Sequence, residues 1–285
     1  MKNKDTPYII LTSVLTLIFL IIILYFISII VNPKQPISYL QKQLNVKGHK
    51  AELEQDSTNI EPFSHKGTNL HLYYYEQFPS TDTVIIDLPG GAFISSSNTF
   101  AHYKHTKQPH TIVSIEYPVL PKGNYNVAKD FIAAAIDYIA NVRYPTKRII
   151  LSAASAGCYY ATKIINEGKY NDRIVKYICI SGYFGYDTIP NIYTFVCEKV
   201  YLHQFIKKSN RRTYEKCNPI PPHILTFYAT GANDPLKIST VEFLRQSGEE
   251  DRIIEYQDSD HCFYLYYNKL ITMTFYENLA EFINL

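Results

Sequence analysis

The sequence predicts an α/β fold in which helices cover both faces of a mainly parallel sheet. Short apolar stretches of strand length alternate with segments whose apolar residues recur at helical spacing. Several of the strand-like stretches are almost continuous runs of Val, Ile and Leu, as expected for strands buried on both faces. A length of 285 residues suits one such domain with a short additional segment.

The composition narrows the range of functions. Hydrophobic residues make up 46% and charged residues 19% of the chain, which argues against general disorder. The net charge is only +2, and no long basic stripe runs through a folded region, so we expect no nucleic-acid partner. None of the five cysteines forms a CxxC pair, so we expect no metal site. Cys158 and Cys179 lie in apolar stretches that predict burial, whereas pairing of Cys197 with Cys217 stays open.

The N-terminal region predicts a membrane anchor. Residues 8–31 carry no charge, and as a helix they would rise about 36 Å, enough to cross a hydrocarbon core of about 30 Å. The alternative is a cleaved signal peptide, which would have a shorter apolar region and a cleavage site of small residues. Bulky residues and Pro33 follow instead. We therefore expect an uncleaved transmembrane signal anchor over residues 1–33 and a linker with an N-terminal cap segment over residues 34–70.

The orientation in the membrane is only weakly indicated. Lysines are somewhat more numerous after the span than before it, which slightly favours a cytoplasmic main domain. The chain holds no Asn-x-Ser/Thr sequon, which agrees with that side. We expect a single-pass protein of the endoplasmic reticulum or another internal membrane.

The main domain is expected over residues 71–285, with its elements in alternating order. After a short helix near residues 38–45 and an irregular stretch to about residue 66, strands are predicted at the starts of segments 71–76, 83–93, 111–117, 148–157, 176–184, 223–236 and 252–261. Helices are predicted over residues 127–142, after residue 157 and over residues 272–283. Residues 187–222 break this order, so we expect a cap insertion over the strand ends. Its basic cluster faces either water or a membrane, and comprises Lys207, Lys208, Arg211 and Arg212.

Ser155 lies at the end of a predicted strand, where functional groups of parallel sheets gather. In the segment AASAG, the small residues Ala153 and Gly157 allow the strand to turn sharply into a helix with Ser155 at the tip. A serine in such a turn becomes a nucleophile when a neighbouring base takes its proton. Taken alone, the motif fits a plain helix N-cap equally well.

The segment LPGGAF supplies glycines at the end of another strand. Gly90 and Gly91 allow the backbone to come close to a reacting group, and backbone N–H groups there stabilise negative charge on a carbonyl oxygen. The N–H of Ala156 would add a donor at the start of the helix. By itself, Pro-Gly-Gly is more typical of an ordinary turn.

His261 follows the last predicted strand and Asp234 follows the one before it. The chain holds nine histidines, and His261 is selected by its place in the order of elements. The order Ser, Asp, His favours Asp234 as the acid. Asp258 and Asp260 are nearer in sequence, but neighbours in one loop seldom face the imidazole correctly.

Together these motifs resemble the hormone-sensitive-lipase-like branch of the α/β-hydrolases, which includes arylacetamide deacetylases and steryl acetyl hydrolases. LPGGAF is similar to the family's HGGGF, and AASAG is similar to its GDSAG. EYPVLPKGNYNVAKDF is similar to YRLAPEHPFPAALDD, and HCFYL is similar to the His-bearing H-G-F. The similarity extends over residues 84–282. GANDPL resembles the loop that carries the family's Asp. The resemblance implies an α/β-hydrolase fold, a triad of Ser155, Asp234 and His261, and an oxyanion hole of Gly90, Gly91, Ala92 and Ala156.

The chain departs from the family pattern at four positions. Pro89 replaces a histidine that usually braces the oxyanion loop, and Ala92 replaces the third glycine. Ala153 and Ala154 replace Gly-Asp. These changes bear on catalytic efficiency more than on the type of reaction.

The sequence therefore predicts a membrane-anchored serine carboxylic-ester hydrolase, an esterase, lipase or deacetylase that needs no metal or organic cofactor. The anchor favours a lipophilic ester such as a lipid or steryl acetate, and an amidase acting on aryl amides is a nearby alternative. A different class is also open: a non-catalytic protein that binds a ligand or partner on this fold.

Overall fold

The computed structural model describes residues 14–25, 41–42, 46–76, 82–96, 100–106, 111–120, 122–185, 216–265 and 270–285. Eight strands in this part of the chain form one sheet, in the order β1-β2-β4-β3-β5-β6-β7-β8. The strands are β1 (Asn59–His65), β2 (Thr68–Glu76), β3 (Thr83–Leu88), β4 (Thr111–Ile115), β5 (Arg148–Ala154), β6 (Ile174–Ile180), β7 (Leu225–Gly231) and β8 (Ile253–Tyr256). β2 is antiparallel to both of its neighbours, and every other pair is parallel. The mainly parallel sheet predicted from the sequence is confirmed.

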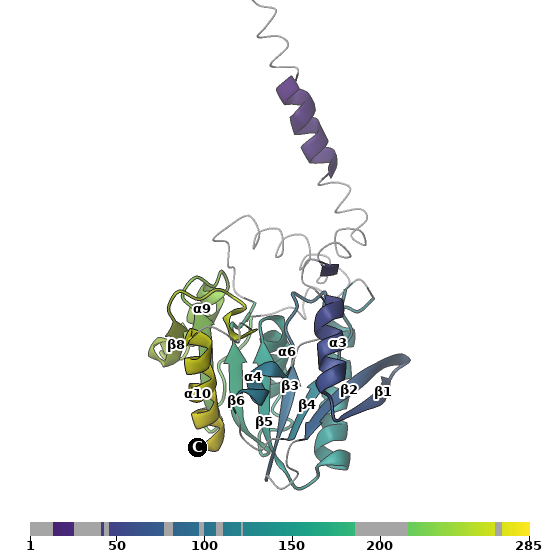
Figure 1. Cartoon of the computed structure of the whole chain (residues 1–285), viewed down its shortest axis with the longest axis vertical. Coiled ribbons are helices and arrows are strands. Elements are labelled where there is room, and N and C mark those ends of the chain that lie inside the picture. Colours follow the sequence, from purple (N-terminus) through teal and green to yellow (C-terminus); the bar gives the residue numbers. More distant parts are fainter. Residues whose placement is uncertain are drawn as a thin grey trace, which may run out of the picture.

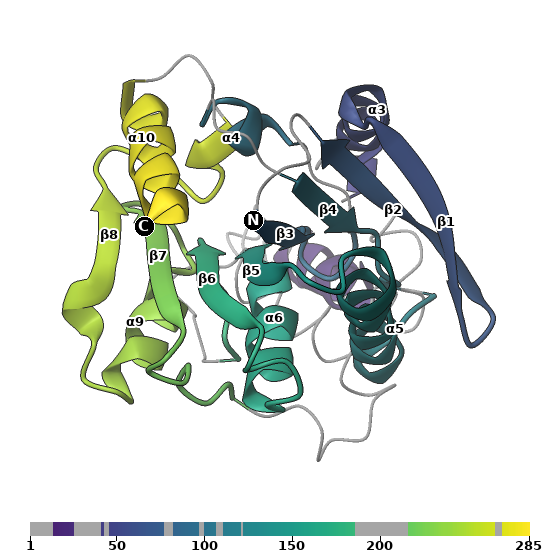
Figure 2. The same cartoon turned by 90° about the horizontal axis from the view of Figure 1, so that it is seen from below.

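Helices cover the two faces of the sheet (Figures 1 and 2). One face carries α5 (Tyr125–Tyr138), α6 (Ala156–Asn166) and α9 (Lys237–Arg245), and the other carries α3 (Val46–Asp56), α4 (Ala101–Lys104) and α10 (Leu270–Asn284). Three short helical segments lie between these elements: the π-helix η1 (Ile139–Arg143) and the 3-10 helices η4 (Glu250–Arg252) and η5 (Phe263–Leu265). Strands buried under helices on both sides explain why their sequences are nearly continuous apolar runs.

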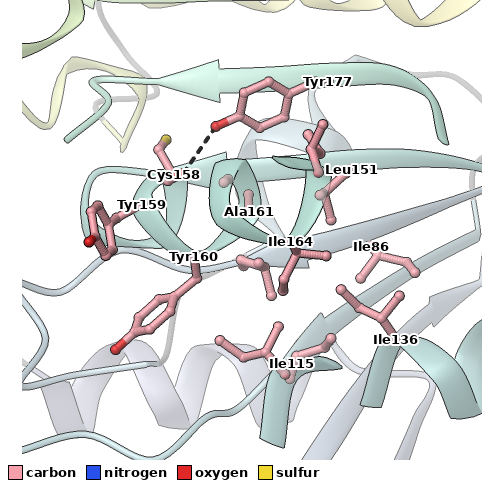
Figure 3. Packing of buried hydrophobic residues seen from close by; sticks show 14 of the residues in the cluster. Ile86, Ile115, Ile136, Leu151, Cys158, Tyr159, Tyr160, Ala161, Ile164 and Tyr177 are labelled. Carbon is pink, nitrogen blue, oxygen red and sulfur yellow. Dashed lines mark hydrogen bonds between the residues drawn. The ribbon is translucent and has the colours of Figure 1, made fainter. Parts of the chain in front are cut away.

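The apolar core forms two layers, one on each side of the sheet. In β3, Val84 and Ile86 point into one layer and Ile85 into the other, because successive side chains of a strand alternate in direction. Figure 3 shows Ala161 and Ile164 of α6 among the strand residues of the first layer. Each fully buried Val, Leu or Ile side chain stabilises the fold by about 1.5–3 kcal/mol relative to the same side chain in water. The packing fixes α6, and with it the start of that helix, against the sheet.

The stretch to about residue 66, which the sequence pattern predicts to be irregular, is largely regular structure. It contains α3 and the edge strand β1, which pairs with β2 along its whole length. The side chains of β1 alternate between exposed and half-buried, and Pro62 lies in its middle. An edge strand with so little buried surface has no apolar run in its sequence, so the sequence pattern does not predict it. The helix expected near residues 38–45 lies mostly outside the described residues.

The predicted anchor is described only in part. Residues 14–25 are helical, with Leu17 and Phe19 exposed to 59% and 64%, and residues 8–13 and 26–31 lie outside the described residues. A helix over residues 14–25 rises about 18 Å. Within the described ranges, no helix has both the length and the apolar character of a membrane span.

Most of the predicted cap, residues 187–222, also lies outside the described residues, as does its basic cluster at residues 207–212. The buried positions predicted for Cys158 and Cys179 are confirmed, with the two sulfur atoms 3.4 Å apart.

Candidate active site

Ser155 occupies a sharp turn between β5 and α6. Its backbone has φ +49°, a left-handed conformation that costs a residue with a side chain about 1–3 kcal/mol. The Ser155 N–H donates to the Ile180 carbonyl of β6 at 2.9 Å, which holds the turn against the sheet. At Gly157 a Cβ would lie 2.1 Å from the Leu88 carbonyl oxygen, so only glycine fits there. The strained backbone at Ser155 is therefore held by the hydrogen bond to β6 and by the close packing of Gly157 against the end of β3.

His261 and Asp234 meet Ser155 at the same edge of the sheet. The His261 Nε2 lies 2.9 Å from the Ser155 Oγ, and the His261 Nδ1 lies 2.9 Å from the Asp234 Oδ1. The three residues follow β5, β7 and β8, which are parallel strands with their carboxyl ends on one side. The structure thus places the three residues selected from the sequence in one continuous hydrogen-bonded series.

Asp234 is a buried carboxylate with several hydrogen-bond donors. Its Oδ1 accepts the Leu236 N–H at 2.7 Å in addition to His261, and its Oδ2 accepts the Thr230 hydroxyl at 3.2 Å. Burial raises the pKa of Asp234, but His261, the nearby Ser181 hydroxyl and the Leu236 N–H together outweigh it, so the pKa lies below its ordinary value. Asp234 is consequently ionised near neutral pH.

His261 is placed to exchange a proton with Ser155. Burial lowers the pKa of the imidazole, but the Asp234 carboxylate raises it by more, and the pKa lies above its ordinary 6.5. The side chain remains 29% exposed, so the ring is accessible from one side. A histidine with this pKa both accepts a proton from a serine and returns it to a leaving group near neutral pH.

The loops that carry Asp234 and His261 are bound to each other through their backbones. The Asn233 N–H donates to the Ser259 carbonyl at 2.8 Å. Gly231, at the end of β7, passes so close that a Cβ there would lie 2.4 Å from the Asp260 carbonyl oxygen. The glycine therefore allows the separation at which the imidazole reaches the carboxylate.

Helix α10 supports the histidine loop from the other side. The Thr272 hydroxyl donates to the Phe263 carbonyl at 2.9 Å, and the Tyr276 hydroxyl donates to the Tyr264 carbonyl at 3.0 Å. All four side chains are buried. These bonds fix the chain directly after His261.

The two acids nearest to His261 in sequence lie at the surface, and the charge of Asp260 adds to the rise in the pKa of His261. Asp258 and Asp260 are exposed, and the Asp260 Oδ1 accepts the Cys262 N–H at 2.9 Å. The carboxylate at hydrogen-bond distance from the His261 Nδ1 is that of Asp234.

The glycine segment after β3 lies directly beside Ser155. A Cβ at Gly90 would lie 3.0 Å from the Ser155 Cβ. The chain then runs through three successive residues with positive φ, Gly91 (+130°), Ala92 (+51°) and Phe93 (+62°). Ala156, the first residue of α6, follows Ser155. Gly90 and Ala156 thus flank the serine, whereas Gly91 and Ala92 shape the loop of residues 88–93. We call it the oxyanion loop after the role that the sequence predicts for it.

An open hollow of about 620 Å³ lies between the Asp234 loop and α9. Its lining includes Asp234, Lys237, Ile238 and Arg245, but neither Ser155 nor His261.

Two residues near Asp234 were not selected from the sequence. Thr230 donates to the carboxylate, as described above. Ser181 is fully buried with φ +51°, and its hydroxyl has no partner of good geometry among the described residues, although it is near enough to lower the Asp234 pKa. Their position at the carboxyl ends of β7 and β6 is the feature of the sequence from which a role near the site could have been predicted.

Solved structures with this fold include several esterases. The thermostable carboxylesterase EstE1 from a metagenomic library aligns with a TM-score of 0.66 and 15% identity, over 88% of this chain and 96% of that one. An esterase from Pyrobaculum calidifontis aligns with a TM-score of 0.67 and 13% identity, over 87% and 92%. An esterase of the bacterial hormone-sensitive lipase family aligns with a TM-score of 0.65 and 14% identity, over 87% and 95%.

No family model matches the chain, and no curated protein does either. At identities of 13–15% the structural likeness establishes the fold. The resemblance inferred from the sequence motifs is thus confirmed at the level of the α/β-hydrolase fold found in hormone-sensitive-lipase-like esterases.

Proposed function

We propose that this chain is a serine hydrolase that cleaves carboxylic esters. The observation that carries the proposal is the series Ser155, His261 and Asp234, joined by two contacts of 2.9 Å at the carboxyl ends of parallel strands. The esterases that share the fold support the same reaction class.

The reaction would proceed through an acyl-enzyme. The Ser155 oxygen attacks the ester carbonyl carbon as His261 Nε2 takes the serine proton, giving a tetrahedral intermediate. When the intermediate collapses, His261 returns that proton to the leaving alcohol and Ser155 keeps the acyl group. His261 then takes a proton from water, the resulting hydroxide attacks the acyl carbon, and Ser155 is released with its proton restored. Asp234 holds the imidazole and stabilises its charged form.

Backbone N–H groups beside Ser155 would stabilise the negative oxygen of the intermediate. The candidates are those of Gly90, Gly91, Ala92 and Ala156. Gly90 and Ala156 flank the serine, and the start of α6 adds a favourable helix dipole. Removing one such donor from an enzyme typically lowers kcat by about 100- to 1,000-fold.

The substrate class and the location belong to the same proposal. The apolar segment at residues 8–31 would anchor the chain in an internal membrane as a single-pass protein, and a lipophilic ester such as a lipid or steryl acetate would then be within reach. Resistance of the full-length chain to extraction by alkaline carbonate tests the anchor. Its release into the soluble fraction would contradict it.

The test of the activity uses the full-length chain and p-nitrophenyl esters of increasing acyl length. We expect turnover that Ser155→Ala abolishes, together with labelling of Ser155 by a fluorophosphonate. Ser247→Ala, which removes a serine far from the site in sequence and structure, should leave both signals unchanged. Absence of turnover and of labelling in a folded protein would contradict the proposal and favour a non-catalytic binding protein; cleavage of aryl amides in preference to esters would favour an amidase.

A further inference from the structure

The oxyanion loop holds a conformation that its own sequence does not favour. Ala92 and Phe93 both have positive φ, a region that residues with side chains rarely occupy. The Ile94 and Ser95 N–H groups, which directly follow the loop, donate to the Gly91 carbonyl at 2.9 and 3.0 Å. These bonds close the turn locally but do not fix its orientation relative to Ser155, which requires contacts from outside the loop.

The segment after β4 provides such contacts at both ends of the loop. At the near end the Tyr117 hydroxyl donates to the Pro89 carbonyl at 2.5 Å, and both groups are buried. At the far end the Leu120 N–H donates to the Phe93 carbonyl at 2.9 Å. Pro89 has neither an N–H nor a polar side chain, so its carbonyl is the group through which this residue can form a hydrogen bond.

The ring of Tyr117 is held in place by the helix that begins at the serine. It makes an edge-to-face contact with Tyr160 of α6, with ring centroids 5.2 Å apart. Burial raises the pKa of the Tyr117 phenol well above its ordinary value, so the hydroxyl keeps its proton and remains a donor across the working pH range. Tyr117 therefore connects the oxyanion loop to the nucleophile helix.

Holding the Pro89 carbonyl has a direct consequence for Gly90. The Pro89 C=O and the Gly90 N–H belong to one planar trans peptide unit and point in opposite directions. When Tyr117 fixes the carbonyl, it also fixes the direction of that N–H. The Gly90 backbone lies against Ser155, since a Cβ there would be 3.0 Å from the serine Cβ.

We propose that Tyr117 is a positioning residue that, through the Pro89 carbonyl, aims the Gly90 N–H at the oxyanion. This inference rests on the proposed ester hydrolysis and deepens it. Tyr117 itself would not touch the substrate.

The test compares Tyr117→Phe with the unsubstituted full-length chain. The substitution keeps the ring and its contact with Tyr160 but deletes the hydroxyl. An N–H donor that points in the wrong direction should lower kcat less than a donor that is missing. We therefore expect kcat for p-nitrophenyl butyrate to fall about 10-fold, with KM changed less than twofold. Tyr170→Phe is the matched control, because the Tyr170 hydroxyl also donates to a backbone carbonyl, that of Ala133 at 3.1 Å, away from the site.

An alkyl boronic acid gives a second readout. Its boron bonds to the Ser155 oxygen while the serine proton passes to His261, which leaves a tetrahedral anion where the intermediate would form. Affinity for this inhibitor should weaken about 10-fold in Tyr117→Phe, in parallel with kcat/KM, and remain unchanged in Tyr170→Phe.

Each outcome is decisive. Equal losses of kcat in both variants, or an unchanged kcat and inhibitor affinity in Tyr117→Phe, would overturn the positioning role while leaving ester hydrolysis intact. If the unsubstituted chain neither turns over nor reacts at Ser155, the proposed function fails and the positioning role fails with it.

Discussion

Asp87 lies in the middle of the sheet, where a charged group is costly. It is 2% exposed; the Ser114 hydroxyl donates to its Oδ2 at 3.1 Å, and the Tyr103 hydroxyl lies 3.4 Å from its Oδ1. Burial raises the pKa of Asp87 to about 7, an effect that these hydroxyls and that of Ser152 reduce but do not cancel. The substitution Asp87→Asn removes this titration while keeping the size of the side chain.

The magnitude follows from the difference between folded and unfolded pKa values. A rise from 3.8 to about 7 is about 3 units, and at 1.36 kcal/mol per unit it corresponds to about 4 kcal/mol. Because the pKa is raised, the folded state holds a proton that the unfolded chain has released between pH ~4 and ~7. The contribution of Asp87 to stability is therefore present below pH ~4 and is lost as the pH rises through ~7.

The assay is urea unfolding of the full-length chain and of Asp87→Asn at several pH values from 4 to 9. The chain has no Trp, so far-UV circular dichroism or the fluorescence of its 26 Tyr reports the transition. We expect the free energy of unfolding of the variant, relative to the unsubstituted chain, to increase by up to ~4 kcal/mol between pH 4 and 9. The exposed Asp172→Asn serves as the control for a surface carboxylate. A difference that stays constant with pH, or decreases, would refute the reasoning.

Three further predictions concern the site and the C-terminal helix. If His261 is the base, kcat/KM should rise with pH through an apparent pKa above 6.5, and Asp234→Asn should reduce it by about 10,000-fold; a pH-independent kcat/KM would contradict this. Gly231→Ala places a methyl group 2.4 Å from the Asp260 carbonyl oxygen, so the histidine loop should move and kcat should fall at least about 100-fold, whereas an unchanged kcat would show that the loop can yield. Lys176 donates through its Nζ to the Phe282 and Ile283 carbonyls at the end of α10, so Lys176→Met should lower the free energy of unfolding by about 1–3 kcal/mol in urea, and equal stability would exclude this anchoring role.

Much of the fold could be predicted from the sequence because central parallel strands leave a strong local signal. The stretches that became β3, β4, β5 and β6 are buried on both faces and rich in Val, Ile and Leu, and their order along the chain implied the sheet. The edge strand β1 left no such signal, because half of its side chains face water and it includes Pro62.

That Ser155, Asp234 and His261 lie close together could be predicted from the order of strands, since residues that follow parallel strands share one edge of the sheet. Their catalytic role stays a prediction until turnover is measured. The local order of elements also sufficed to prefer Asp234 over the exposed Asp258 and Asp260.

What the sequence determined by itself was local: the buried central strands, the helices α5, α6 and α10, the turn at Ser155 and the glycines beside it. The tertiary structure alone decided the side-chain contacts that support the site and the core. The Tyr117 hydroxyl reaches the Pro89 carbonyl, and the hydroxyls of Tyr103 and Ser114 surround Asp87, over sequence separations of 16–28 residues. Such contacts depend on strand register and on the packing of side chains from separate elements, which no periodicity within a single segment encodes.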